Sequence, residues 1–215
     1  DASTIEESLI NLAVSQKKIP IAATGNWGNT EKQYPAAYTN CIAVGASNPN
    51  GSRSAYSSYG DWIDLLAPVG YGTSGYGFRQ VTYPCFFDAT NDTTPCTDNA
   101  LSWRPADSEC DDTDDPDVLP SCSFTNFSFE PSMGTSFAAP QVSAVAALLK
   151  SIDPNYTFSQ IRYKLQYGAT PTASAWVSNE KGFGILNAYE TLKAPNIPTT
   201  TQAYRFWSNV YNGHF

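Results

Sequence analysis

Residues 134–140 read Gly-Thr-Ser-Phe-Ala-Ala-Pro and lead directly into an apolar run from Val142 to Leu149. The run predicts a buried helix, so Ser136 stands at a glycine-led turn just before a helix N-terminus. Free backbone N–H groups and the helix dipole favour negative charge at such a place. This suits a serine whose attack creates an oxyanion, but a serine nucleophile needs a base. The only histidine of the chain is His214, next to its end.

The composition limits the class of protein. The chain has 215 residues, 41% of them hydrophobic, which fits one large domain or one domain with a short appendage. No run reaches the ~18 apolar residues that a membrane-spanning helix needs. No signal peptide is visible at Asp1, so any export signal is expected upstream or already removed. Nucleic acid is not expected as a partner, because the sequence has no basic stripe that could displace counterions.

The acidity of the chain is concentrated in residues 107–117. This segment holds seven Asp or Glu residues and no Lys or Arg, and the net charge of the whole chain is −8. Three interpretations stay open. The segment is a solvated loop, a Ca²⁺ site built from clustered carboxylates, or a loop that selects substrates by charge. It lacks the glycine and terminal glutamate spacing of an EF-hand loop.

The cysteines indicate an oxidising compartment. Four of the five crowd into residues 85–122, a region that is rich in Asp, Pro, Thr and Ser. This pattern predicts two disulfides within a surface insertion, in any of three pairings. Zinc is the alternative, but there is no Cys-x₂-Cys spacing and no nearby histidine. The fifth cysteine, Cys41, lies in an apolar run and is expected to be a buried free thiol. The four are Cys85, Cys96, Cys110 and Cys122.

The order of the predicted elements is typical of a parallel α/β sheet. Residues 3–18 predict an amphipathic helix, with Ser3 and Glu6 as a capping box and Ile5, Leu9, Leu12 and Ala13 on one face. A second capping box, Thr157 with Gln160, opens another helix. The remaining predicted elements are strands at 19–24, 42–46, 62–67 and 182–187, and helices at 136–151, 157–167 and 188–192.

Two distant segments are expected to meet at one edge of this sheet. Residues 21–26 end a buried strand with the amide side chain of Asn26, and Ser136 opens a buried helix. In a parallel sheet the carboxyl ends of strands and the N-termini of helices converge where ligands bind. Asn26 and Ser136 are therefore predicted to lie together, although they are far apart in the sequence.

These residues resemble the subtilisin-like serine proteases. Ser136 in Gly-Thr-Ser-Phe-Ala-Ala-Pro matches the nucleophile motif of that family, and Asn26 in Ala-Ala-Thr-Gly-Asn matches its oxyanion asparagine. Other segments match in order, so the resemblance covers roughly residues 3–67 and 132–193. These segments are Tyr34-Pro35, Ile42-Ala43-Val44-Gly45-Ala46, Ser57-Ser58-Tyr59-Gly60, Leu66-Ala67-Pro68 and Gly182-Phe183-Gly184-Ile185-Leu186-Asn187-Ala188.

The resemblance implies a role for each site residue. Ser136 is expected to attack the peptide carbonyl, and the Ser136 N–H and the Asn26 amide are expected to bind the oxyanion. Gly25 and Thr135, beside them, are expected to contact substrate. No cofactor is expected for catalysis. A structural Ca²⁺ is expected at the carbonyls of three residues and the carboxylate of Asp64, with a plain surface acid as the alternative for Asp64. The three carbonyl residues are Ala36, Tyr38 and Cys41.

The chain departs from the family pattern before Asn26. Only 25 residues precede it, without a histidine and without an Asp-Thr-Gly motif. The expected fold is therefore an α/β three-layer parallel sheet flanked by helices, subtilisin-like and incomplete at its N-terminal side. It would be the C-terminal part of a secreted endopeptidase that acts on proteins or peptides, and the catalytic histidine and aspartate would come from an upstream part. The fragment alone is expected to be inactive. The alternative is a non-catalytic protease-like scaffold or surface structural protein.

The expected domain organisation follows from the same resemblance and from composition. Residues 1–193 are expected to be the catalytic-domain part, with the disulfide-rich acidic insertion at about 69–131. Residues 194–202 read as a linker by composition. Residues 203–215 are rich in aromatic side chains and read as the start of another module, or as a strand that packs on the first domain.

Overall fold

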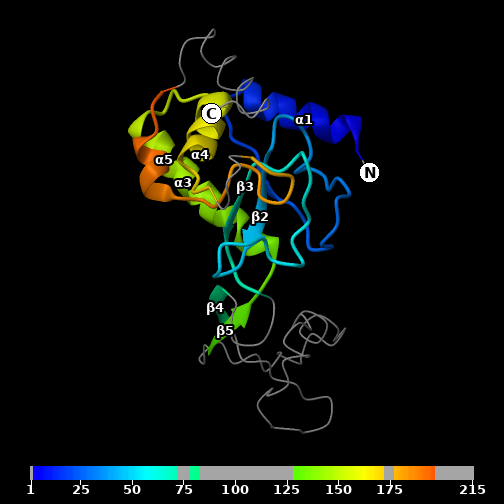
Figure 1. The fold of residues 1–215 in the computed structure, drawn as a ribbon. Helices are drawn as coiled ribbons and strands as arrows, with labels where there is room; N and C mark the ends of the chain where they lie inside the picture. Colours follow the sequence, from blue (N-terminus) through cyan, green and yellow to red (C-terminus); the bar gives the residue numbers. More distant parts are fainter. Residues whose placement is uncertain (1, 72–77, 83–127, 172–176, 197–215) are drawn as a thin grey trace, which may run out of the picture. The chain divides into compact units, whose positions relative to one another are not determined.

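The computed structural model describes residues 2–71, 78–82, 128–171 and 177–196, and Figure 1 shows their path. The chain divides into two compact units, one formed by residues 1–78 with 133–215 and the other by residues 79–132. Strands β4 (Phe78–Thr82) and β5 (Ser128–Ser132) form a separate two-stranded sheet. All other elements belong to the larger unit.

The larger unit is built on a parallel sheet of three strands in the order β1-β2-β3. The strands are β1 (Ile21–Ala23), β2 (Ile42–Ser47) and β3 (Leu65–Pro68), and both pairings are parallel. All six residues of β2 are buried, whereas those of β1 are half-buried. A strand buried on both faces reads as a continuous apolar run, and this is the pattern of β2. The predicted α/β class with a parallel sheet is confirmed.

The helix that follows Ser136 covers the sheet. A short 3₁₀ helix, η1 (Thr135–Phe137), leads into α3 (Ala139–Ile152). The buried face of α3 packs in one core cluster with β2 and β3 and with Ile161 and Leu165 of α4 (Phe158–Gly168). Figure 1 shows α3 and α4 together with α5 (Ala188–Lys193) next to the strands. The buried face of α3 consists of Val142, Val145, Ala146 and Leu149.

The beginnings of α4 and α5 are set by side-chain caps. The predicted capping box at α4 is confirmed, since Gln160 N–H donates to Thr157 Oγ1 and Thr157 N–H donates to Gln160 Oε1. At α5 the Asn187 side chain accepts from Glu190 N–H. Gly168 allows α5 to approach α4, because a Cβ there would lie 2.4 Å from Thr191 Cα.

Helix α1 (Thr4–Ser15) is shorter than the sequence predicts and buries no residue. Ser3 Oγ accepts from Glu6 N–H, but the Ser3 N–H donates to the Tyr38 hydroxyl at 2.7 Å. The predicted capping box is therefore only half formed. The apolar face of α1 is on the surface, with Ile5 74%, Leu9 60% and Leu12 52% exposed.

The strand predicted at residues 182–187 is wrong. Ile185 forms only single bridges, parallel to Leu66 and antiparallel to Thr170. Gly182 has φ 54° and Gly184 has φ 126°, so the backbone leaves the extended conformation twice within this segment. A Cβ at Gly184 would lie 2.2 Å from the Thr170 carbonyl oxygen, which explains why a glycine stands there.

Several predictions concern residues that the structure does not describe. The four clustered cysteines, the acidic segment 107–117 and the aromatic segment 203–215 lie outside the described residues. Cys41, which is among the described residues, is a buried free thiol, as the sequence predicts. No helix in the described ranges combines the length and the apolar character needed to cross a bilayer.

Candidate active site

The first half of the site is the turn that follows β1. Thr24 N–H still donates to Val44 O, so the turn begins at Gly25, whose φ of 93° ends the strand. The Gly25 N–H donates to Thr135 Oγ1 at 3.2 Å. The next residue, Asn26, is exposed at the end of the sheet. The turn therefore presents an amide side chain beside the start of η1.

The second half is the turn from Gly134 to Ser136. Gly134 has φ 136° and is the N-cap of η1, and a Cβ there would lie 3.3 Å from Asn26 Nδ2. Glycine is favoured here because other residues rarely adopt this φ, and a side chain would also crowd the amide. Ser136 is exposed and is the second residue of η1. The first N–H groups of a helix have no intrahelical acceptor, and Ser136 N–H is one of them.

The two turns are joined through Asn26 and Thr135. Asn26 Oδ1 accepts from Thr135 N–H at 2.9 Å and from Thr135 Oγ1 at 3.0 Å. Because both partners donate, the amide oxygen must face Thr135 and the NH₂ group is left to donate elsewhere. The structure thus brings Asn26, Gly25 and residues 134–136 together, as the sequence predicted for Asn26 and Ser136. Such an arrangement offers an N–H and an amide NH₂ next to a hydroxyl.

No base stands beside this hydroxyl within the described ranges. They contain no histidine, because His214 falls outside them. Tyr56 is a titratable group that hydrogen-bonds directly to the serine turn, since Gly134 N–H donates to its hydroxyl at 3.3 Å. Burial raises the pKa of Tyr56 above 10.0, so this phenol stays neutral at physiological pH. Sequence reasoning missed Tyr56, because nothing in its spacing marks contact with a residue so far along the chain.

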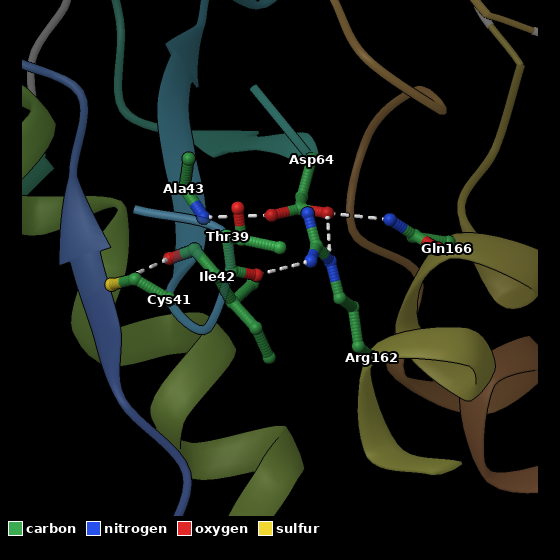
Figure 2. A network of polar contacts seen from close by, with 7 residues as sticks. All are labelled: Thr39, Cys41, Ile42, Ala43, Asp64, Arg162 and Gln166. Carbon is green, nitrogen blue, oxygen red and sulfur yellow. Dashed lines mark hydrogen bonds and ion pairs between the residues drawn. The ribbon is translucent and has the colours of Figure 1, made fainter. Parts of the chain in front are cut away.

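Asp64 does not have the surroundings of a cation ligand. It is 1% exposed, and its Oδ2 accepts from Ala43 N–H at 2.9 Å. Its Oδ1 accepts from Arg162 Nε at 2.7 Å and from Gln166 Nε2 at 2.5 Å, and Figure 2 shows these donors around the carboxylate. Arg162 also donates to the Thr39 carbonyl. The guanidinium supplies the positive charge that a Ca²⁺ ion would otherwise bring.

The predicted metal set therefore does not fit a cation at Asp64, and the alternative of a plain surface acid is wrong as well. Of the three carbonyl residues, Tyr38 accepts from Cys41 N–H at 3.0 Å, and all three are buried. Across the described ranges, no three His, Cys, Asp or Glu side chains gather in a way that could hold a metal. Arg162 and Gln166 lie about 100 positions after Asp64, so no local pattern could reveal them.

Comparisons with known proteins show what the chain as a whole is similar to. The family model described as "Subtilase family" matches residues 1–184. Subtilisin BL of Lederbergia lenta is 29% identical over 187 residues, which are 87% of this chain and 50% of that protein. The chain thus spans about half the length of this curated relative.

Solved structures show the same fold. Proteases from Pseudoalteromonas arctica PAMC 21717 superpose with a TM-score of 0.64 and 24% identity, over 90% of this chain and 47% of theirs. Fervidolysin from Fervidobacterium pennivorans, described as a keratinolytic enzyme related to subtilisin, superposes with a TM-score of 0.60 and 22% identity. That match covers 92% of this chain and 26% of fervidolysin. At these identities the structures support the fold alone.

Proposed function

Because this chain belongs to the subtilase family, we propose that it is the C-terminal part of the catalytic domain of a secreted serine endopeptidase. Ser136 Oγ adds to the carbonyl carbon of a peptide bond, and the hydroxyl proton passes to a histidine. An aspartate orients this histidine, and both residues come from the upstream part of the protein. The Ser136 N–H and Asn26 Nδ2 bind the oxyanion. The amine leaves with the proton from the histidine, and water hydrolyses the acyl-enzyme.

The observation that carries this proposal is the pair of hydrogen bonds from Thr135 to Asn26 Oδ1. They fix the amide so that its NH₂ group faces away from Thr135 and is available to a ligand. Donors that are already oriented need no reorganisation when charge develops, and this makes them effective in catalysis. Gly25 precedes Asn26 in the chain, and Thr135 holds the oxygen of this amide, so we assign both to substrate contact.

The upstream part of the same protein is the proposed partner of this chain. Relatives of about twice its length support this assignment. So does the surface of the larger unit, where α1 exposes Ile5, Leu9 and Leu12. Strand β1 pairs only with β2 among the described residues. An open strand edge and an apolar helix face are surfaces that adjoining elements of a domain usually cover.

Two finer points of the proposal rest on sequence alone. The four cysteines of residues 85–122 favour secretion, because disulfides persist in oxidising compartments. A structural Ca²⁺ is proposed only as one interpretation of the acidic segment 107–117, since Arg162 already neutralises Asp64. The substrates are proteins or peptides.

The test is covalent labelling of the longer protein with a fluorophosphonate, followed by peptide mass spectrometry. We expect the label on Ser136, and we expect Ser136→Ala to remove it. Ser143→Ala is the matched control, because Ser143 is an exposed serine on α3 whose hydroxyl donates only to the Ala139 carbonyl. The chain alone should remain unlabelled, since triad members act as a unit. Absence of label from a longer protein that carries an upstream histidine would refute the proposal.

A non-catalytic scaffold is the second candidate, since the histidine that Ser136 needs would have to come from the upstream sequence. The upstream sequence separates the two candidates directly. An Asp-Thr-Gly and a His-Gly-Thr motif there are expected for an enzyme. Their loss from the gene would favour the scaffold.

A further inference from the structure

The loop of residues 53–60 contacts the asparagine turn through its backbone and through the Ser58 side chain. Ser58 N–H donates to Gly25 O at 2.9 Å, and Gly28 N–H donates to Tyr56 O at 2.7 Å. Trp27 N–H donates to Ser58 Oγ at 3.3 Å. Three bonds thus fasten this loop to both sides of Asn26.

The same loop contacts the serine turn through one side chain. Gly134 N–H donates to Tyr56 Oη at 3.3 Å. The Tyr56 ring is half-buried and packs on the core cluster formed by the sheet and α3. Since its backbone carbonyl holds Gly28 and its hydroxyl holds Gly134, Tyr56 links the two turns that form the site.

The loop is also tied down beyond Tyr56. Ser54, two residues earlier in the same loop, donates its Oγ proton to Gly70 O at 2.6 Å. Burial raises the pKa of Tyr56 above 10.0, so the phenol keeps its proton. Its oxygen accepts from Gly134 N–H.

The loop has its own clamp, so it can serve as a fixed support. Arg53 Nη1 donates to Ser57 O at 2.6 Å and to the carbonyls of Ser54 and Ala55. Its guanidinium lies 4.1 Å from the centre of the Tyr59 ring. Ala46 N–H of β2 donates to Ser57 Oγ, which ties the loop to the sheet.

Two of the three successive N–H groups of the serine turn have acceptors within the protein, and the third is left for a ligand. Gly134 N–H donates to Tyr56, Thr135 N–H donates to Asn26, and Ser136 N–H is the oxyanion donor of the proposed mechanism. We propose that Tyr56 is a positioning residue, which acts through the Gly134 peptide to aim the Ser136 N–H and hydroxyl. This inference rests on the proposed function and adds a residue that does not touch substrate.

The test compares Tyr56→Phe with Tyr59→Phe in the longer protein. Tyr56→Phe keeps the ring and removes only the oxygen that Gly134 needs. Tyr59→Phe removes a hydroxyl from the same loop and keeps the ring under Arg53. We measure the rate of fluorophosphonate labelling at Ser136, kcat and KM for a peptide substrate, and the hydrogen exchange of the Gly134 amide.

For Tyr56→Phe we expect labelling and kcat to fall by roughly three- to tenfold, the range for one lost hydrogen bond, with KM within about twofold. Gly134 exchange should accelerate in this variant alone, and Tyr59→Phe should match the wild type. Labelling and exchange that are unchanged in Tyr56→Phe would overturn the inference. So would a loss shared equally by both variants. A wild type that is never labelled refutes the proposed function instead, and Gly134 exchange still decides whether Tyr56 holds the turn.

Discussion

Asp64 and Arg162 form the ion pair that ties the sheet to α4. The carboxylate also accepts from Ala43 of β2 and from Gln166 of α4, so both of its oxygens have partners. A buried charge is costly unless it is paired and hydrogen-bonded, and these contacts meet that condition. The pair therefore fixes the position of α4 on the sheet, whatever its net contribution to stability.

The same carboxylate affects Cys41. Burial, and then the negative charge of Asp64, raises the pKa of the Cys41 thiol from 9.0 to about 12. The thiolate is the reactive form, so we expect iodoacetamide at pH 8.5 to alkylate native Cys41 at least ~100-fold more slowly than in the unfolded chain. Peptide mass spectrometry in buffer and in urea measures this ratio. Equal rates in the two states would show that the thiol is neither buried nor protonated.

The sign of the pH effect follows from the same shift. Between pH 9 and about 12 the unfolded chain loses the Cys41 proton while the folded chain keeps it. Ionisation then favours unfolding, so the contribution of this thiol to stability is full below pH 9 and falls through that range. Cys41→Ala removes this part of the pH dependence and serves as the control.

At the scale of elements, the end of α1 has a backbone cause. Lys17 N–H donates to Val14 O, and Lys18 N–H donates to Ala13 O. With Lys17 at φ 60°, this is a Schellman motif whose left-handed position is held by a lysine. A residue with a side chain is strained in that conformation, whereas glycine is not.

Lys17→Gly should therefore stabilise the chain by about 0.5–1 kcal/mol, even though glycine adds freedom to the unfolded state. Lys17 Nζ also donates to Asn155 Oδ1 at 3.4 Å, an exposed contact of little weight. Urea unfolding followed by circular dichroism measures the change. Lys18→Gly is the matched control, because Lys18 is not left-handed and gains nothing from glycine. Stabilisation by both variants, or by neither, would contradict this explanation.

Prediction from sequence succeeds where one local signal decides. The apolar run 42–46 became the buried strand β2, and the Thr157 cap opened α4 as expected. It failed where distant groups decide. Residues 182–187 read as a strand, but Gly182 and Gly184 take positive φ angles where the backbones of Asp64 and Thr170 lie against them. The meeting of Asn26 with the serine turn followed from the topology of parallel sheets. The contact of Tyr56 with Gly134 joins residues 78 positions apart, and no local pattern marks it.

At the scale of the larger unit, the apolar face of α1 is the surface feature that most needs a partner. Ile5, Leu9 and Leu12 follow one another at spacings of four and three, so they form a single stripe along the helix. Exposed apolar stripes of this kind drive association. The chain on its own should therefore self-associate through α1.

Replacing all three residues with glutamine should reduce self-association, measured by sedimentation velocity, and lower the binding of an apolar dye. The free energy of unfolding should change by no more than about 0.5 kcal/mol per site, because these side chains are exposed and glutamine is a good helix former. The control is Leu148→Gln with Ile152→Gln, which removes exposed apolar side chains from α3 instead. If the control dissociates the chain as well as the α1 variant does, general stickiness rather than the α1 stripe causes the association. If only the α1 variant dissociates, the self-association runs through the α1 stripe.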